Sequence, residues 1–212
     1  MAPTRSKQHA LIIAAHPMTE SLTHSIVRQV REALRDADIS VEVADLHAEG
    51  FISAMTPADV SYYRGEGDLP EDVVREQRRF DKADMVYFVF PIYWWTVPAL
   101  LKGWFERVFT SGWAYDYQGD GKASGRLKPV PVHLIITITT GEESFCRHGS
   151  KAAFQTQVVD GILGYCGLKD VRTSMLWGAD YVDDENFASF MAEITATSPH
   201  RSVAKQSHSE CI

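Results

Sequence analysis

Apolar and polar positions form blocks along the chain that predict strands and helices in turn. Residues 9–15 (HALIIAA) and 85–90 (MVYFVF) are short, almost wholly apolar runs. Runs of this kind are typical of strands buried on both faces of a parallel sheet. Between them, leucine, isoleucine and valine recur every fourth residue among charged residues over 21–38, which predicts an amphipathic helix.

The same pattern continues to the end of the chain. We expect further strands at 39–43, 130–138 and 171–177, and further helices at 71–83, 98–109, 152–165 and 185–194. Asp68 and Glu71 stand at capping-box spacing around Pro70 and predict the start of one of these helices. The glycine-containing stretches 46–69 and 112–125 are expected to be loops.

Five strand–helix repeats predict an α/β fold, a doubly wound five-stranded parallel sheet in the flavodoxin-like order 2-1-3-4-5. We expect one domain over 1–195 and a polar, flexible tail over 196–212. In such sheets ligands bind outside the carboxyl ends of strands 1 and 3. The loops after strands 1, 3 and 4 are therefore the candidate binding loops.

The first of these loops delivers His16, Ser21 and Thr23 to the start of a helix. Unpaired N–H groups and the positive end of the helix dipole make such a position suited to anions. The alternative is that Ser21 only caps the helix. No glycine-rich nucleotide fingerprint accompanies the loop.

The second loop places three aromatic side chains in a row, Tyr93, Trp94 and Trp95, between two prolines. Three adjacent large rings cannot all enter one core layer, and they suit stacking on a planar ligand. A dimer interface is the alternative, because tryptophan and tyrosine are also enriched there.

The third loop reads Thr139-Thr140-Gly141-Glu142. Gly141 allows the backbone to approach a ligand closely, although an ordinary turn explains the same residues. Taken together, an anion site, an aromatic wall and a glycine turn suit a ligand with a phosphate end and a flat heterocycle. A flavin nucleotide has both.

Charge and composition narrow the function classes. The 212-residue chain has a net charge of −7, which argues against non-specific nucleic-acid binding. It has no apolar run of about 18 residues, so we expect no membrane span. The short polar start lacks a signal-peptide core, which favours the cytoplasm. The cysteines show no C-x-x-C pair and the histidines no ligand spacing, so no metal site is predicted.

Several segments resemble one known family, the NAD(P)H:quinone oxidoreductases of the DT-diaphorase type, which have a flavodoxin-like fold. The matching segments are AHPMTES (15–21), LPEDVVREQRRFDKADMVYFVFP (69–91), VPALLKGWFERVF (97–109), GWAYDY (112–117) and ITTG (138–141). The third segment, with FPIYWW before it, is highly specific. The resemblance spans most of residues 9–180.

The resemblance implies contacts residue by residue. It assigns the flavin pyrophosphate to His16, Ser21, Leu22 and Thr23, the ring to Pro91, Ile92, Tyr93, Trp94 and Trp95, and the ring's pyrimidine edge to Thr139, Thr140 and Gly141. Glu142, also placed beside the cofactor, replaces a second glycine that is usual in the family. Trp94, Trp95, Tyr115 and Tyr117 are the implied substrate contacts, the two tyrosines reaching the pocket of a partner subunit in a homodimer.

The resemblance also implies an activity. NAD(P)H would give a hydride to bound FAD, with FMN as the alternative cofactor, and a quinone-like acceptor would then take two electrons in a ping-pong cycle. No residue is assigned as catalytic. Two other functions stay open, namely a flavin- or nucleotide-binding regulatory protein without turnover, and an azo- or nitroreductase that uses the same flavin site.

Overall fold

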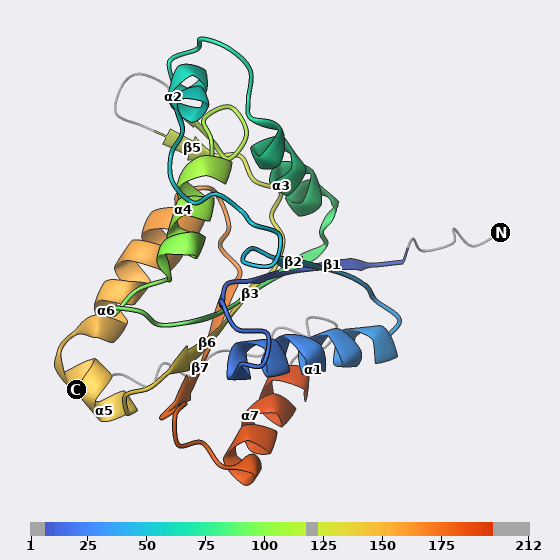
Figure 1. Ribbon diagram of the computed structural model, residues 1–212, viewed down its shortest axis with the longest axis vertical. Coiled ribbons are helices and arrows are strands. Elements are labelled where there is room, and N and C mark those ends of the chain that lie inside the picture. Colours follow the sequence, from blue (N-terminus) through green and yellow to red (C-terminus); the bar gives the residue numbers. More distant parts are fainter. Residues whose placement is uncertain (1–6, 118–122, 197–212) are drawn as a thin grey trace.

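The fold is built on one five-stranded parallel sheet. The computed structural model describes residues 7–117 and 123–196. The sheet order is β2-β1-β3-β6-β7 (Figure 1). Its strands are β1 (His9–Ala14), β2 (Ser40–Asp45), β3 (Met85–Pro91), β6 (Val132–Ile138) and β7 (Val171–Trp177). Apart from two short strands between β3 and β6, this is the order 2-1-3-4-5, so the predicted fold class is confirmed.

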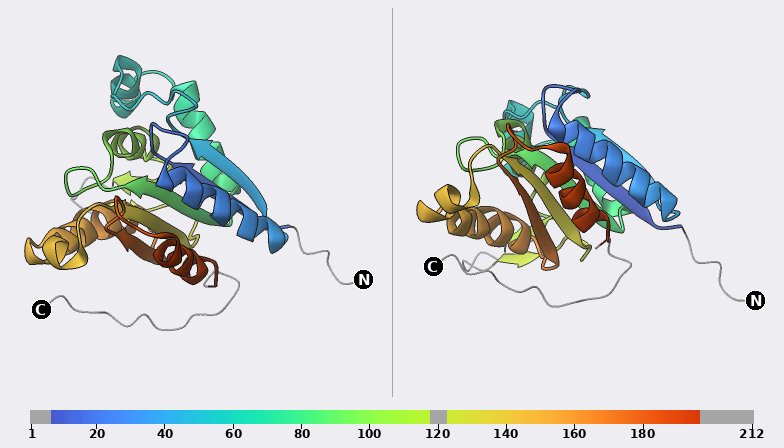
Figure 2. Two further views of the ribbon diagram at one scale, coloured as in Figure 1. Left: turned by 60° about the horizontal axis from the view of Figure 1, so that its bottom comes forward. Right: turned by 90° about the horizontal axis from the view of Figure 1, so that it is seen from below.

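Helices cover both faces of the sheet (Figures 1 and 2). One face carries α1 (Leu22–Asp36) and α7 (Asp184–Ala196). The other carries α3 (Glu71–Lys82), α4 (Ala99–Val108), α6 (Ser150–Phe154) and the π-helix η1 (Gln155–Gly164). Within the part of the chain that the structure describes, no helix is long and apolar enough to cross a membrane.

Alternate side chains of each central strand enter different cores. In β1, Leu11 and Ile13 pack with α3 and α4, whereas Ala10 and Ile12 pack with α1 and α7. All four are fully buried. This explains the lack of polar residues in the run, because each face of the strand packs against a hydrophobic layer. Burying one large apolar side chain stabilises the fold by roughly 1.5–3 kcal/mol.

The stretch 46–69, expected to be a loop, contains a short helix, α2 (Pro57–Tyr63). Thr56 and Asp59 form a capping box at its start, with Pro57 in the first turn. The sequence therefore held a local signal for this helix. The prediction of an irregular loop was wrong there.

The glycine-rich stretch 112–125 contains an antiparallel hairpin of β4 (Tyr115–Tyr117) and β5 (Ala123–Gly125). Gly125 lies so close to Gly167 that an added Cβ would stand 2.2 Å from the Gly167 nitrogen. Contact with a distant segment, rather than local propensity, fixes this hairpin. The intervening residues 118–122, with two of the glycines expected in the loop, lie outside the described residues.

Two helix predictions were wrong in detail. The segment expected as one α-helix over 152–165 begins as α6 and continues as η1, after a further helix α5 (Glu142–Arg147). In η1 an added Cβ on Gly161 would stand 2.8 Å from the carbonyl oxygen of Thr156, so glycine tolerates the wide turn. Helix α3 begins after Pro70 without a side-chain cap, so the capping box of Asp68 and Glu71 is absent.

Helix α7 extends to Ala196, slightly beyond the expected end of the last helix. The tail predicted over 196–212 otherwise lies outside the described residues. The single-domain boundary therefore stays a prediction.

The buried histidine His133 should make the free energy of unfolding depend on pH. It lies in β6, where its Nε2 is 2.9 Å from the Ser174 hydroxyl. Burial, aided by Arg172, lowers the pKa of His133 to about 3. The unfolded chain, with a histidine pKa of about 6.5, binds this proton more readily. Stability should therefore fall as pH drops from about 6.5 towards 3, by up to about 1.4 kcal/mol per pH unit.

In His133→Leu this proton linkage disappears, although the unpaired Ser174 hydroxyl lowers stability at every pH. Urea unfolding of both proteins at several pH values between 4.5 and 7.5 measures the two slopes. The variant should have the shallower slope. Parallel slopes would show that His133 is protonated equally in the folded and unfolded states.

Candidate active site

The three candidate loops meet at the carboxyl ends of neighbouring strands, because β1, β3 and β6 are adjacent in the sheet. Backbone hydrogen bonds join the strand ends. Ala15 donates to the Val89 carbonyl (3.1 Å), and Ile92 donates to the Thr137 carbonyl (2.9 Å). The predicted convergence of these loops is therefore present in the structure.

The β1–α1 loop ends at Ser21, which is the N-cap of α1. Its Oγ accepts a hydrogen bond from the His24 N–H (3.3 Å). The first-turn N–H groups of Leu22 and Thr23 have no intrahelical acceptor, as at any helix start. Thr23 is buried, so its hydroxyl does not face a ligand outside the helix. Ser21 therefore caps the helix, and its contact with an anion stays a prediction.

His16 lies beside this helix start, with its ring 6.2 Å from that of His24, centroid to centroid. Burial lowers the pKa of His16 below its usual value. The neutral form of the ring is therefore favoured at pH 7, and it can offer a hydrogen bond to a ligand.

His24 and Asp45 are parts of this region that the sequence analysis did not single out. His24 Nε2 is 2.7 Å from Asp45 Oδ2, and His24 Nδ1 is 3.0 Å from Ser21 Oγ. Both ring nitrogens of His24 have partners, and these connect the end of β2 with the candidate phosphate site. The signal in the sequence was the spacing of Ser21 and His24, which places them three residues apart on one helical face.

The aromatic loop after β3 is a tight turn. Tyr93 and Thr96 pair across it, with backbone hydrogen bonds of 3.0 and 3.2 Å. Trp94 and Trp95, at its tip, have left-handed φ values of 49° and 65°. Trp94 is 92% exposed, and the Trp95 ring lies 6.0 Å from that of Phe145. Left-handed backbone is unfavourable for large side chains and is typical of functional sites.

The turn after β6 holds a buried hydroxyl group with no partner. Thr140 Oγ1 is inaccessible to solvent, and no described residue hydrogen-bonds to it. Beyond it, Gly141 has no atom within 4 Å of the position of a Cβ, so space is open above the turn. Glu142, the departure from the family pattern, pairs with Lys151 at 3.1 Å. This ion pair offsets the negative charge that Glu142 would otherwise place near a ligand.

Of the two tyrosines predicted to reach a substrate, Tyr115 is partly buried and Tyr117 is 64% exposed. The Tyr115 ring makes an edge contact with Tyr165 at 5.3 Å. Burial, followed by the nearby Tyr165 and Tyr63, raises the pKa of Tyr115, so its phenol stays neutral at pH 7. The sequence gives no sign that Tyr63 and Tyr165 lie near Tyr115, because only the fold brings these three residues together.

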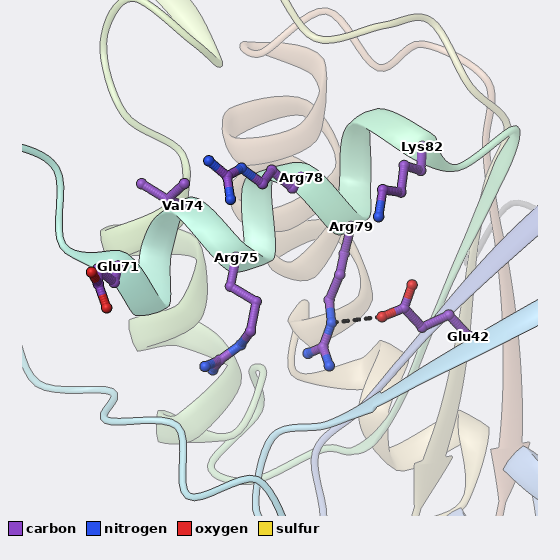
Figure 3. A pocket seen from close by; sticks show the side chains of 7 residues that line it. All are labelled: Glu42, Glu71, Val74, Arg75, Arg78, Arg79 and Lys82. Atoms are coloured by element: carbon purple, nitrogen blue, oxygen red, sulfur yellow. Dashed lines mark hydrogen bonds and ion pairs between the residues drawn. The ribbon is translucent and has the colours of Figure 1, made fainter.

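An open hollow lies away from these loops, along α3 and beside β2 (Figure 3). It is open, has a volume of about 740 Å³, and is lined mainly by Arg75, Arg78, Arg79 and Lys82. Arg79 is paired with Glu42 (2.8 Å) and Glu49 (2.6 Å). The other three cations are exposed, which is typical of a solvated helix face.

The residues at the strand ends fit a flavin nucleotide. The start of α1 offers N–H groups to phosphate, the tryptophan turn offers a flat apolar surface to a ring, and Thr140 Oγ1 offers an unused hydrogen bond at the third loop. Such a site can hold a planar redox cofactor beside exposed aromatic rings.

Comparisons with known proteins point the same way. A family model described as a flavodoxin-like fold matches residues 8–197. NAD(P)H dehydrogenase (quinone) 1 of Cavia porcellus is 32% identical over 191 residues, which cover 81% of this chain and 69% of that protein. Ribosyldihydronicotinamide dehydrogenase (quinone) of Mus musculus is 30% identical over 199 residues, covering 82% and 84%.

Among solved structures, an NAD(P)H:quinone oxidoreductase from Methanothermobacter marburgensis superimposes with a TM-score of 0.80 at 28% identity. The match covers 91% of this chain and 98% of that one.

Proposed function

Since the chain belongs to the NAD(P)H:quinone oxidoreductase family with a flavodoxin-like fold, we propose that it transfers reducing equivalents from NAD(P)H through bound FAD to a quinone-like acceptor. The observation that carries this proposal is the buried, unpartnered Thr140 hydroxyl in the loop where the family places the flavin's polar edge. A buried polar group without a partner is unfavourable by about 1–3 kcal/mol. A ligand that hydrogen-bonds to it removes that penalty.

The chain's own residues would hold the cofactor at both ends. Ser21 and the N–H groups of Leu22 and Thr23 bind phosphate oxygens at the start of α1, and His16 adds a neutral donor. Residues 91–95 lie along one side of the ring, and residues 139–142 bond its polar edge. When bound, the flavin supplies hydride chemistry, accepting two electrons from one substrate and giving them to the next.

The protein's contribution to turnover is position and exclusion of water. Trp94 and Trp95 form an apolar surface against which a nicotinamide or a quinone stacks. Because the two substrates are both flat and need the same surface, they bind in turn, which gives ping-pong kinetics. FAD is the proposed cofactor, and FMN is the alternative that cofactor analysis distinguishes.

We propose a homodimer whose site lies at the subunit interface, in the cytoplasm where NAD(P)H is available. Trp94, Tyr117 and Tyr63 are 92%, 64% and 76% exposed. A second copy would cover these rings and close the pocket. Light scattering of the purified protein tests the mass, and a monomer with full activity would contradict this part of the proposal.

The first experiment identifies the cofactor. The purified protein is examined for a flavin absorption spectrum, its flavin is released for mass analysis, and NAD(P)H oxidation is followed with a quinone or an azo dye as acceptor. FAD with quinone-dependent turnover supports the proposal, and faster turnover of the azo dye would favour an azoreductase. Bound flavin without turnover would favour a regulatory flavin-binding protein, and no uptake of FAD or FMN would overturn the proposal.

Thr140→Val tests the carrying observation, because valine keeps the shape and removes the hydroxyl. One hydrogen bond contributes about 0.5–1.5 kcal/mol, so the flavin dissociation constant should rise roughly two- to tenfold. The cofactor-free variant should be as stable as wild type or slightly more stable, because the deleted group has no partner there. Unchanged flavin affinity together with lower stability would show that the hydroxyl serves the fold instead.

A further inference from the structure

An ion pair between Glu142 and Lys151 joins the third binding loop to helix α6. Glu142 is the first residue of α5 and directly follows Gly141. Lys151 is the second residue of α6, and its Nζ lies 3.1 Å from Glu142 Oε1. The left-handed residue Gly149 (φ 72°) separates the two helices. The pair therefore places one negative and one positive charge at the turn after β6.

The stability of the fold does not explain why a lysine stands at this position. Helix α6 continues as η1, so Lys151 lies in the first turn of a helical segment that runs to Gly164. The positive end of the helix dipole disfavours a cation there. The side chains of Lys151 and Glu142 are 35% and 50% exposed, and ion pairs this exposed contribute little to folding. A lysine placed against the helix dipole for so small a gain indicates a role in the neighbouring loop.

Both charges lie near the position proposed for the polar edge of the flavin. Thr140 Oγ1, the buried hydroxyl without a described partner, is two residues before Glu142. Consecutive Cα atoms are about 3.8 Å apart, so the Glu142 Cα lies within about 7.6 Å of the Thr140 Cα. The Debye length at physiological ionic strength is about 8 Å. The pair is therefore close enough to act electrostatically on a ring that hydrogen-bonds to Thr140.

The charge of that ring changes during the proposed reaction. A hydride carries two electrons and one proton, so NAD(P)H leaves as NAD(P)⁺ and the ring gains one negative charge. The acceptor then takes the hydride and a further proton from solvent, and the ring becomes neutral again. A nearby cation favours the negative form of the ring, and a nearby carboxylate disfavours it. Glu142 alone would therefore make the flavin harder to reduce, and Lys151 opposes this effect.

The other charged groups of the same segment are more open to solvent. Glu143 and Arg147 pair with each other, and their side chains are 87% and 64% exposed. His148 is also exposed. Salt strongly screens charges in such positions. Of the two paired cations near this turn, Lys151 is thus the less screened.

We propose that Lys151 sets the reduction potential of the bound flavin by balancing the charge of Glu142 at the polar edge of the ring. This inference rests on the proposed function, because it takes residues 139–142 as contacts of the ring. The potential decides how readily the cofactor takes a hydride from NAD(P)H and which acceptors it can then reduce. The pair would thereby limit the range of acceptors.

The test measures the potential of the bound flavin by equilibration with a redox dye at about pH 8, together with the affinity for oxidised FAD. In Lys151→Met the potential should fall by roughly 15–45 mV, a three- to thirtyfold loss of affinity for reduced relative to oxidised flavin. Affinity for the oxidised, uncharged ring should stay as in wild type. Glu142→Gln should raise the potential by a similar amount, and the double variant should lie near wild type. Lys151→Arg keeps the charge and should keep the potential.

Lys128→Met is the matched control. Lys128 pairs with Asp84 at 3.2 Å, and the two side chains are 46% and 40% exposed. Both residues precede their strands and so lie at the amino ends of β6 and β3. The seven residues of β3 span about 20 Å, which is more than two Debye lengths. This variant should have the wild-type potential.

Equal potentials in Lys151→Met and wild type would overturn the inference and leave the proposed function standing. The same holds for an equal loss of affinity for oxidised and reduced FAD, because that result would assign the lysine to the shape of the site. If the wild-type protein binds no flavin at all, the proposed function is overturned, and the inference with it.

Discussion

Gly103→Ala should lower the free energy of unfolding by about 3 kcal/mol or more, although alanine is the better helix former by about 1 kcal/mol. Gly103 lies in the middle of α4, and an added Cβ would stand 2.0 Å from the carbonyl oxygen of Ser53. The obstacle is backbone, which cannot rotate away. To make room for the methyl group, the segment around Ser53 must move away from α4. Overpacking of this kind costs 1–3 kcal/mol and occasionally more.

Thermal unfolding measures the effect, and a loss of about 3 kcal/mol corresponds to roughly 6–12 °C in a domain of this size. Gly141→Ala is the matched control, because Gly141 has φ of −74° and nothing within 4 Å of its Cβ position. The control should change the melting temperature by little. An equal stability of Gly103→Ala and wild type would mean that Ser53 does not lie against α4.

Asp59→Asn should lower the free energy of unfolding by about 3 kcal/mol. Asp59 accepts a hydrogen bond from Arg107 Nε at 2.9 Å, and both side chains are almost fully buried, at 4% and 2% exposure. Removing one partner of a buried ion pair leaves an uncompensated charge, which typically costs 3–5 kcal/mol. The lower end applies here because Arg107 keeps Asp72, at 2.6 and 3.1 Å.

Protonation of Asp59 at low pH should also lower the free energy of unfolding. Burial opposes ionisation of Asp59, but hydrogen bonds from Arg107 and Thr56 lower its pKa. Its stabilisation is therefore complete above the unfolded pKa of about 3.9 and is lost as pH falls through the lower folded value.

Urea unfolding of Asp59→Asn and wild type at pH 7 gives the main comparison. Asp116→Asn, which removes an exposed pair with Arg126, is the control and should cost less than about 1 kcal/mol. Equal losses in the two variants would contradict the burial argument.

Gly103→Ala and Asp59→Asn both disturb contacts of the connection between β2 and α3. Arg107 donates to the Ile52 carbonyl at 2.7 Å and stacks over Phe51 at 5.3 Å. These contacts explain how a stretch of more than twenty residues is held in one conformation. The same connection carries Tyr63, which lies near Tyr115.

The sheet could be predicted because each strand's signal is local. Residues 9–15 and 85–90 are apolar on both faces, and only a doubly covered strand accepts such a run. Strand order then followed from the number of repeats, and the three binding loops followed from strand order. The candidate site was therefore predicted at the level of segments from a pattern that needs no knowledge of side-chain contacts.

What the sequence could not predict depends on contacts between distant residues. Strand β5 lies against a distant segment through the approach of Gly125 to Gly167, and Tyr165 of that segment contacts Tyr115. His24 looked like a lone histidine because its partner Asp45 is twenty-one residues away and on another element. The wide turns of η1 were missed for another reason, because the apolar spacing of 152–165 is that of an ordinary α-helix.

The turn at Trp94 and Trp95 bears on any attempt to engineer a hardier protein. Two successive left-handed residues suit Asn-Gly far better than two tryptophans, and departures of this kind cost of order 1–3 kcal/mol each. A redesign guided by stability alone would replace this pair early, and would thereby remove two exposed aromatic rings from the turn after β3. At this turn the residues present are not the ones that backbone stability favours, so a stabilising substitution is easy to find there.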